Sequence, residues 1–120
     1  MISIIIERIG NDVRALYMSG HSGYSEQGTD IICSSASTLF YTAANALEEL
    51  CSLKAEDIIT VNEDKGDGNV NAVIKVPELT GDAKVKAQTI METIEVGFKC
   101  LEMSVNTDED QYIELIESKN

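Results

Sequence analysis

The residues best suited to chemistry lie in one stretch of the sequence, between Gly20 and Cys33. This stretch contains His21, the only histidine of the chain, and it ends at the cysteine. A cysteine becomes a strong nucleophile when its thiolate is favoured, and both a nearby imidazole and the positive end of a helix favour the thiolate. The pair therefore indicates acyl transfer, in which Cys33 attacks a carbonyl group while His21 takes the thiol proton and later protonates the leaving amine.

The segment between the histidine and the cysteine is predicted to be a loop that approaches the substrate. It is rich in residues that allow backbone conformations closed to others, namely Gly20, Gly23 and Gly28. A hinged loop or a close approach of substrate needs such conformations, and the path can fold back so that the imidazole meets the thiol. Tyr24 has two interpretations, because it either contacts an apolar group of the substrate or covers the loop.

Asp30 stands between this loop and an expected helix, and it also has two interpretations. It either orients His21 as the third member of a catalytic group or caps the helix, and we favour the cap because a nearby carboxylate opposes thiolate formation at Cys33. With Asp30 as cap, Cys33 lies in the first turn, where unpaired N–H groups around it and Ser34 point to a developing oxyanion. Ser37, one turn after Cys33, either donates a hydrogen bond in the site or only packs.

The residue types alone leave a simpler interpretation open, in which the histidine lies on the surface and Cys33 is a small buried apolar residue. Cys51 and Cys100 have no histidine beside them in sequence and are expected to pack. An odd number of cysteines without framework spacing suits a reducing compartment, so we expect no disulfide. One histidine and no Cys-x-x-Cys pair predict no metal site, and the glycines lack the Lys-Ser/Thr of a phosphate loop. No cofactor is expected.

The elements that position these residues follow from the apolar spacing. From the N-terminus, we expect strands at 2–8 and 13–19, a helix at 31–50, strands at 58–63 and 70–76, a helix at 80–101 and a strand at 112–116. The first helix carries an apolar stripe: Ile32, Ala36, Leu39, Phe40, Ala43, Leu47 and Leu50. The second carries another: Val85, Ala87, Ile90, Met91, Ile94, Phe98 and Leu101. The fold class is therefore α+β, in the order ββαββαβ, with both helices on one face of a mostly antiparallel sheet.

Length and charge limit the classes of function. At 120 residues the chain is predicted to form a single domain over 1–120. A net charge of -12 opposes direct binding of nucleic acid and would attract a basic partner, although excess acid also serves solubility alone. The apolar start soon meets Glu7 and Arg8, so it predicts neither a secretory signal nor a membrane span, and we expect a cytoplasmic protein.

The loop and helix start also resemble a known signature. Gly20-His21, Gly23-Tyr24, Gly28 and Asp30-Ile31-Ile32-Cys33 closely resemble the motif of the ribosomal-processing cysteine protease family called Prp. The length and the order of elements are similar over essentially the whole chain. The departures are serines at 22, 25, 34 and 35, where small residues such as alanine are expected, and they change only the local hydrogen bonding.

The resemblance implies an endopeptidase with Cys33 as nucleophile and His21 as proton acceptor and donor. Its substrate would be a basic ribosomal protein, large-subunit protein twenty-seven, which loses a short N-terminal extension after an aromatic residue during ribosome maturation. The family also implies a homodimer and a glycine-rich loop that orders over the peptide. Two alternatives remain: a non-catalytic ribosome-associated binding module, and a redox-sensing thiol protein, which would need a resolving cysteine that the sequence does not visibly supply.

Overall fold

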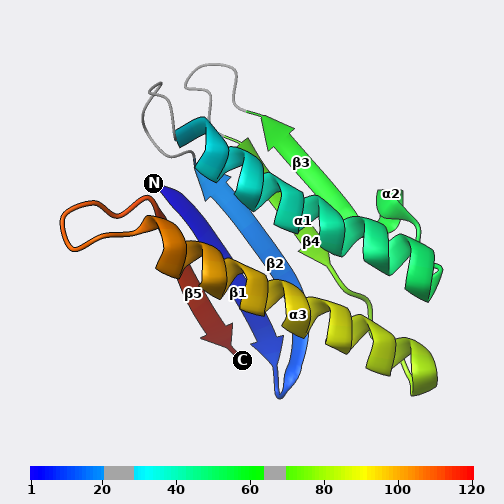
Figure 1. The fold of residues 1–120 in the computed structure, drawn as a ribbon. Coiled ribbons are helices and arrows are strands. Elements are labelled where there is room, and N and C mark those ends of the chain that lie inside the picture. The colour runs from blue at the N-terminus through cyan, green and yellow to red at the C-terminus, as the bar shows by residue number, and fades with distance from the viewer. Residues whose placement is uncertain (21–28, 64–69) are drawn as a thin grey trace.

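The chain folds into one mixed sheet covered by two long helices (Figure 1). A computed structural model describes residues 1–20, 29–63 and 70–120. The elements are β1 (Ile2–Ile9), β2 (Asp12–Gly20), α1 (Thr29–Cys51), α2 (Ala55–Ile58), β3 (Ile59–Glu63), β4 (Val70–Lys75), α3 (Gly81–Val105) and β5 (Ile113–Lys119). The sheet order is β3-β4-β2-β1-β5. Strands β1 and β5 run parallel, while the other neighbouring pairs are antiparallel.

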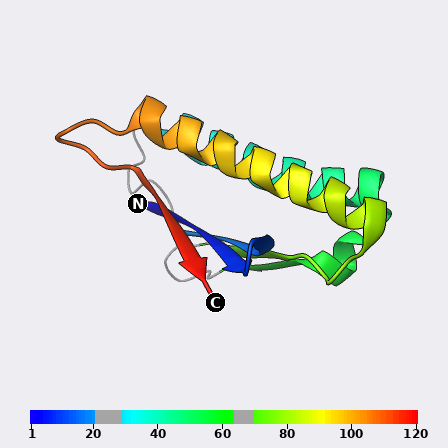
Figure 2. The same cartoon turned by 90° about the horizontal axis from the view of Figure 1, so that it is seen from below.

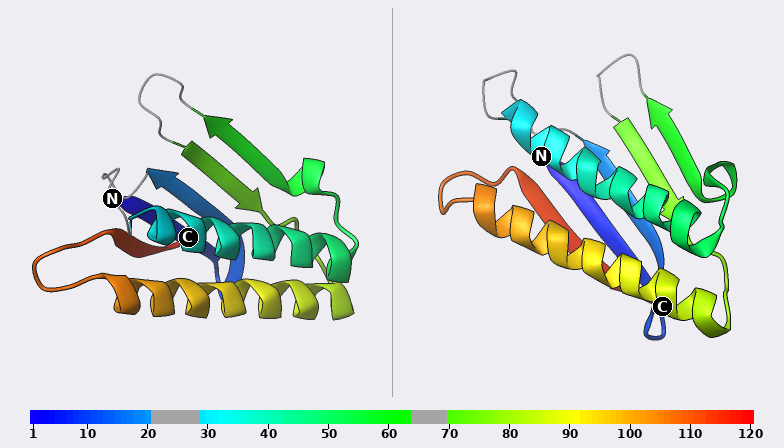
Figure 3. Two further views of the ribbon diagram at one scale, coloured as in Figure 1. Left: turned by 45° about the horizontal axis from the view of Figure 1, so that its top comes forward. Right: turned by 45° about the vertical axis from the view of Figure 1, so that its right-hand side comes forward.

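Both long helices cover the same face of this sheet (Figure 2). They lie side by side along the strands, with α1 nearer to β4 and α3 nearer to β5 (Figures 1 and 3). The predicted α+β class, the order of its main elements and the placement of the two helices are therefore confirmed. None of the helices in the described part of the chain combines the length and apolar character needed to cross a membrane.

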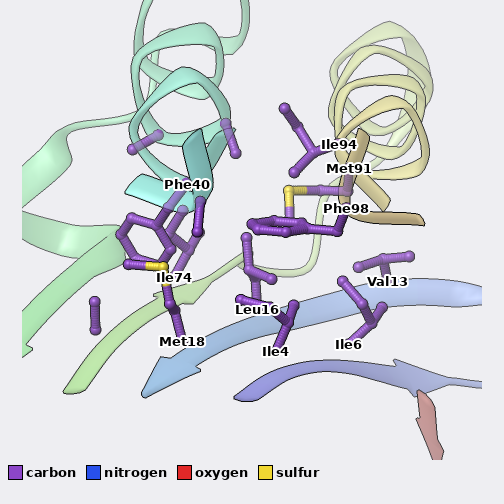
Figure 4. Packing of buried hydrophobic residues seen from close by; sticks show 14 of the residues in the cluster. Ile4, Ile6, Val13, Leu16, Met18, Phe40, Ile74, Met91, Ile94 and Phe98 are labelled. Carbon is purple, nitrogen blue, oxygen red and sulfur yellow. The ribbon is translucent and has the colours of Figure 1, made fainter. Parts of the chain in front are cut away.

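The core lies between the helices and the sheet. In β1 the buried residues alternate with half-buried ones, as expected for a strand with one face on a core. Ile4 and Ile6 point from this strand toward the helix layer on the side of Phe98 of α3, whereas the ring of Phe40 on α1 lies beside Ile74 (Figure 4). All five side chains are almost completely buried. Full burial of one such side chain contributes about 1.5–3 kcal/mol to folding, so the helices are held mainly by these contacts.

Each long helix extends past the core between helices and sheet, so one end of each predicted apolar stripe is exposed. Leu50 is 57% exposed and Val85 is 65% exposed, so the two predicted apolar stripes run past the buried part of each helix. A further short helix, α2, was not predicted. Its last residue is Ile58, which is buried and which the sequence analysis assigned to the following strand.

A buried arginine joins β1, α3 and β5. Each of the five N–H donors of a guanidinium has an acceptor around Arg8: Glu117 on Nε, the Asn11 carbonyl at 3.0 Å and Glu92 at 2.7 Å on the first terminal nitrogen, and Glu92 at 3.0 Å and Glu95 at 2.9 Å on the second. The hydrogen bond to Glu92 raises the pKa of Arg8, and the same bond lowers the pKa of Glu92. The arginine is therefore charged and fully bonded, and it ties the last strand to the body of the fold.

Candidate active site

Cys33 lies near the start of α1 and packs against the edge of the core. Its side chain is half-buried, next to the buried residues Ile32 and Ala36 of the same helix. Leu39, which faces Gly97 of α3, lies roughly 120° from Cys33 around the helix axis. The thiol is therefore on the flank of α1 that faces away from α3.

The helix begins earlier than expected. Its first residue is Thr29, so Asp30 is inside the first turn and does not precede the helix as an N-cap does. In a helix whose first residue is Thr29, the described N–H groups that have no partner within the helix belong to residues 29–31, whereas the helical pattern pairs the N–H of Cys33 with the carbonyl of Thr29. The predicted position of Cys33 within the first turn was therefore wrong.

This shift changes what can activate the thiol. The field of a helix end falls off within the first turn, and Cys33 lies just beyond that turn. The N–H groups of residues 29–31 are the described ones that the helix itself leaves for a developing oxyanion, and they precede the predicted donors at Cys33 and Ser34. The side chain of Asp30 is outside the described part of the chain, so its orienting role stays a prediction.

The serines of the first turns separate into two groups. Ser34 is exposed, and Ser35 donates a hydrogen bond to the carbonyl of Ile31 at 2.8 Å, which ties it to its own helix. Ser37 is half-buried and lies on the same flank as Cys33, one turn further on. Of the two serines predicted to support the site, Ser37 therefore lies on the flank of Cys33, and Ser34 lies on the outer face.

An open hollow of about 500 Å³ lies on that outer face. Its lining residues are Ile31, Ser34, Ser35, Thr38 and Leu39. Leu39 belongs to the flank that faces α3, so the hollow lies on the side of α1 turned away from Cys33. The hollow is therefore not a pocket around the thiol, and the sequence does not predict it because its residue types are common on helix surfaces.

Gly20 ends β2 and has a backbone that only glycine adopts readily. Its φ is +83°, and a Cβ added there would collide with the carbonyl oxygen of Met1. In the sheet Gly20 pairs with Ile2 on one side and Val70 on the other. The prediction that this position needs a special backbone conformation is confirmed, and Met1 is a neighbour that the sequence did not reveal.

The end of β2, the start of α1 and the N-terminus lie at the same end of the molecule (Figure 1). Two residues of the predicted site, Gly20 and Cys33, therefore lie at the same end of the molecule. The other predicted loop residues lie outside the described residues: His21, Gly23, Tyr24 and Gly28. Within residues 1–20, 29–63 and 70–120, no group of three or more His, Cys, Asp or Glu is placed to hold a metal ion.

Comparison with known proteins defines the class of this site. A family model described as "Cysteine protease Prp" matches residues 1–113. The fold is thus that of a cysteine protease. The chain belongs to the Prp family of ribosomal processing cysteine proteases.

Relatives and solved structures agree with this assignment. The Bacillus subtilis (strain 168) protein "Ribosomal processing cysteine protease Prp" is 29% identical over 86 residues, which is 71% of each chain. The Staphylococcus aureus (strain Mu50 / ATCC 700699) protein of the same name is 29% identical over 94 residues, 78% of this chain and 80% of the relative.

Among solved structures, SMU.848 from Streptococcus mutans has a TM-score of 0.77 and 25% identity, covering 100% of this chain and 96% of that one. The S. aureus Prp with a covalently linked product peptide has a TM-score of 0.71 and 27% identity, covering 98% and 100%.

Proposed function

We propose that this protease removes a short N-terminal extension from large-subunit ribosomal protein twenty-seven, cutting after an aromatic residue, with Cys33 as nucleophile and His21 as general base. The observation that carries the proposal is the position of Cys33. It is a half-buried thiol near the start of α1, at the same end of the fold as Gly20, the residue immediately before the only histidine. Solved S. aureus Prp structures contain a substrate peptide and a covalently linked product peptide, which supports peptide cleavage as the reaction.

The proposed reaction has two steps. First, His21 takes the thiol proton, the Cys33 sulfur bonds to the scissile carbonyl carbon, and the C–N bond breaks as the leaving amine receives that proton. Next, water attacks the thioester and gives a proton to the imidazole, and that proton then returns to sulfur as the C–S bond breaks. The carboxylic acid leaves, and both residues return to their starting state. The N–H groups of residues 29–31, which have no partner within the helix, are the nearest described donors of the helix end for the oxyanion.

Charge supports a basic substrate. The chain has a net charge of -12, and exposed acidic residues accelerate encounter with a positively charged partner. A ribosomal protein substrate would supply that positive charge, and a ribosomal processing role would place the enzyme in the cytoplasm. A homodimer is part of the same proposal, and sedimentation velocity at micromolar concentration tests it.

The deciding experiment compares cysteine variants on a peptide that spans the extension. Cys33→Ala should lower kcat by at least about 1000-fold, and His21→Ala should approach that loss, because the nucleophile and its base act as a unit. Cys51→Ala and Cys100→Ala are the matched controls, since each removes a thiol elsewhere on the helices, and both should cleave normally.

Normal cleavage by Cys33→Ala would refute the proposed mechanism. A non-catalytic binding module would show no cleavage by any variant while still capturing the ribosomal protein. A redox sensor would lose its response, rather than a peptidase activity, when Cys33 is replaced.

A further inference from the structure

The fit between Gly20 and Met1 places a constraint directly beside the proposed general base. Gly20 has a φ of +83°, a region that L-residues other than glycine adopt at a cost in strain. One Cα hydrogen of Gly20 points toward Met1, in the direction that the Cβ of an L-residue would take. A Cβ there would collide with the carbonyl oxygen of Met1. Two independent features thus exclude an L side chain at this residue.

The backbone around this contact is well fixed. Gly20 is the last residue of β2, paired with Ile2 of β1 and with Val70 of β4. Met1 is held next to it because the N–H of Ile2 donates a hydrogen bond to the carbonyl of Tyr112 at 2.9 Å. Because strands flank it on both sides and Met1 lies against it, Gly20 has little freedom to relax around an added side chain.

The geometry points to Gly20 as a positioning residue for the reaction. The Met1 carbonyl oxygen packs against it and leaves no room for an L side chain. The inference rests on the proposed function, because the residue that follows Gly20 is His21. The backbone of Gly20 sets the direction in which the chain leaves β2. A change in this direction moves the imidazole relative to Cys33, and a misplacement of about 1 Å can lower the rate about 100-fold.

A comparison of the two alanine enantiomers in place of Gly20 tests the inference. A synthetic segment 1–32 with L-alanine or D-alanine at this position can be ligated to segment 33–120 through the thiol of Cys33. L-alanine has an unfavourable backbone and a Cβ against Met1, whereas D-alanine favours positive φ and directs its Cβ away from that carbonyl. We expect the L-alanine enzyme to have a kcat about 100-fold lower at nearly unchanged KM, and the D-alanine enzyme to keep most of the activity.

Gly10→Ala is the matched control. Gly10 also has a positive φ, of +61°, but an added Cβ there has nothing within 4 Å, and it lies in the turn between β1 and β2. This variant should lose stability while cleaving at the normal rate, so it separates backbone strain in general from strain at the site. Far-ultraviolet circular dichroism on every variant confirms that the chain is folded.

Two results would overturn the inference. One is an L-alanine enzyme with the kcat of the native chain, and the other is a D-alanine enzyme as slow as the L-alanine enzyme. Failure of the proposed function looks different, because Cys33→Ala would then match the native chain in the cleavage assay. In that case the pH dependence of Cys33 alkylation decides: L-alanine in place of Gly20 should change it as His21→Ala does, and D-alanine should leave it as in the native chain.

Discussion

Replacement of Arg8 by methionine should destabilise the fold far more than loss of an exposed ion pair. Arg8 is buried, and its removal leaves Glu95, which is 6% exposed, without its main partner. Breaking a buried ion pair on one side costs about 3–5 kcal/mol. Lys99 also contacts Glu95 at 3.2 Å, so we expect the lower part of that range, about 3 kcal/mol. Since domains are stable by about 5–15 kcal/mol, this is a large part of the total.

Urea unfolding followed by circular dichroism measures the loss. Lys84→Met is the matched control, because it removes a salt bridge to Asp12 whose side chains are 48% and 37% exposed. Exposed pairs contribute about 0–1 kcal/mol, so this variant should unfold almost like the native chain. A loss below about 1 kcal/mol for Arg8→Met would refute the reasoning, because Glu95 would then tolerate burial without the arginine.

The same cluster predicts a dependence on acid. The hydrogen bond from Arg8 lowers the pKa of Glu92 below its ordinary value of 4.5. The stability that Glu92 contributes is therefore present above pH 4.5 and is lost as the pH falls through the lowered pKa of the folded state. In Arg8→Met this part of the acid dependence should disappear. An acid unfolding profile with the same shape in both proteins would contradict the assignment.

The remaining predictions concern the core, the last strand and the substrate. Leu47→Ala should cost about 2–5 kcal/mol in urea unfolding because Leu47 is fully buried, whereas Leu50→Ala, at 57% exposure, should stay within about 0.5 kcal/mol. Asn106→Ala should cost about 1–3 kcal/mol and speed hydrogen exchange at Ile113, since its side chain accepts bonds from Tyr112 and Ile113 and donates one to the Ile113 carbonyl. The kcat/KM for a basic substrate should fall as sodium chloride is raised, and a constant value would exclude charge steering.

The fold could be predicted because each long element has a clear apolar period. Ile2, Ile4 and Ile6 alternate along β1, and Ala36, Phe40 and Ala43 recur at helical spacing along α1. The start of α1 was harder to predict, because Thr29 and Asp30 are both residue types that favour the N-cap position. In the structure both belong to the helix, which begins at Thr29. The short helix α2 is a single turn, which leaves no period to detect.

The site could be predicted only in part, for a related reason. Residue type and the resemblance to Prp predict Cys33, His21 and Gly20 as members of the site, and the structure describes Cys33 and Gly20 but not His21. The contact between Gly20 and Met1 depends on the register of β1 against β2, which residue types do not give. The cluster around Arg8 was also missed, because its acidic partners on α3 and β5 are far away in sequence.

The parallel pairing of β5 with β1 has a consequence for how the chain is made. Strand β1 is synthesised before the other described strands, but its parallel partner β5 is synthesised after every other described element. One edge of β1 therefore stays unpaired until β5 has been made. During that delay β1 has an open edge, available to any extended segment that comes near. Contacts between such distant parts of a chain form slowly, so a nascent copy completes its sheet late. Ser3 on β1 then receives its Glu114 partner, and the edge closes.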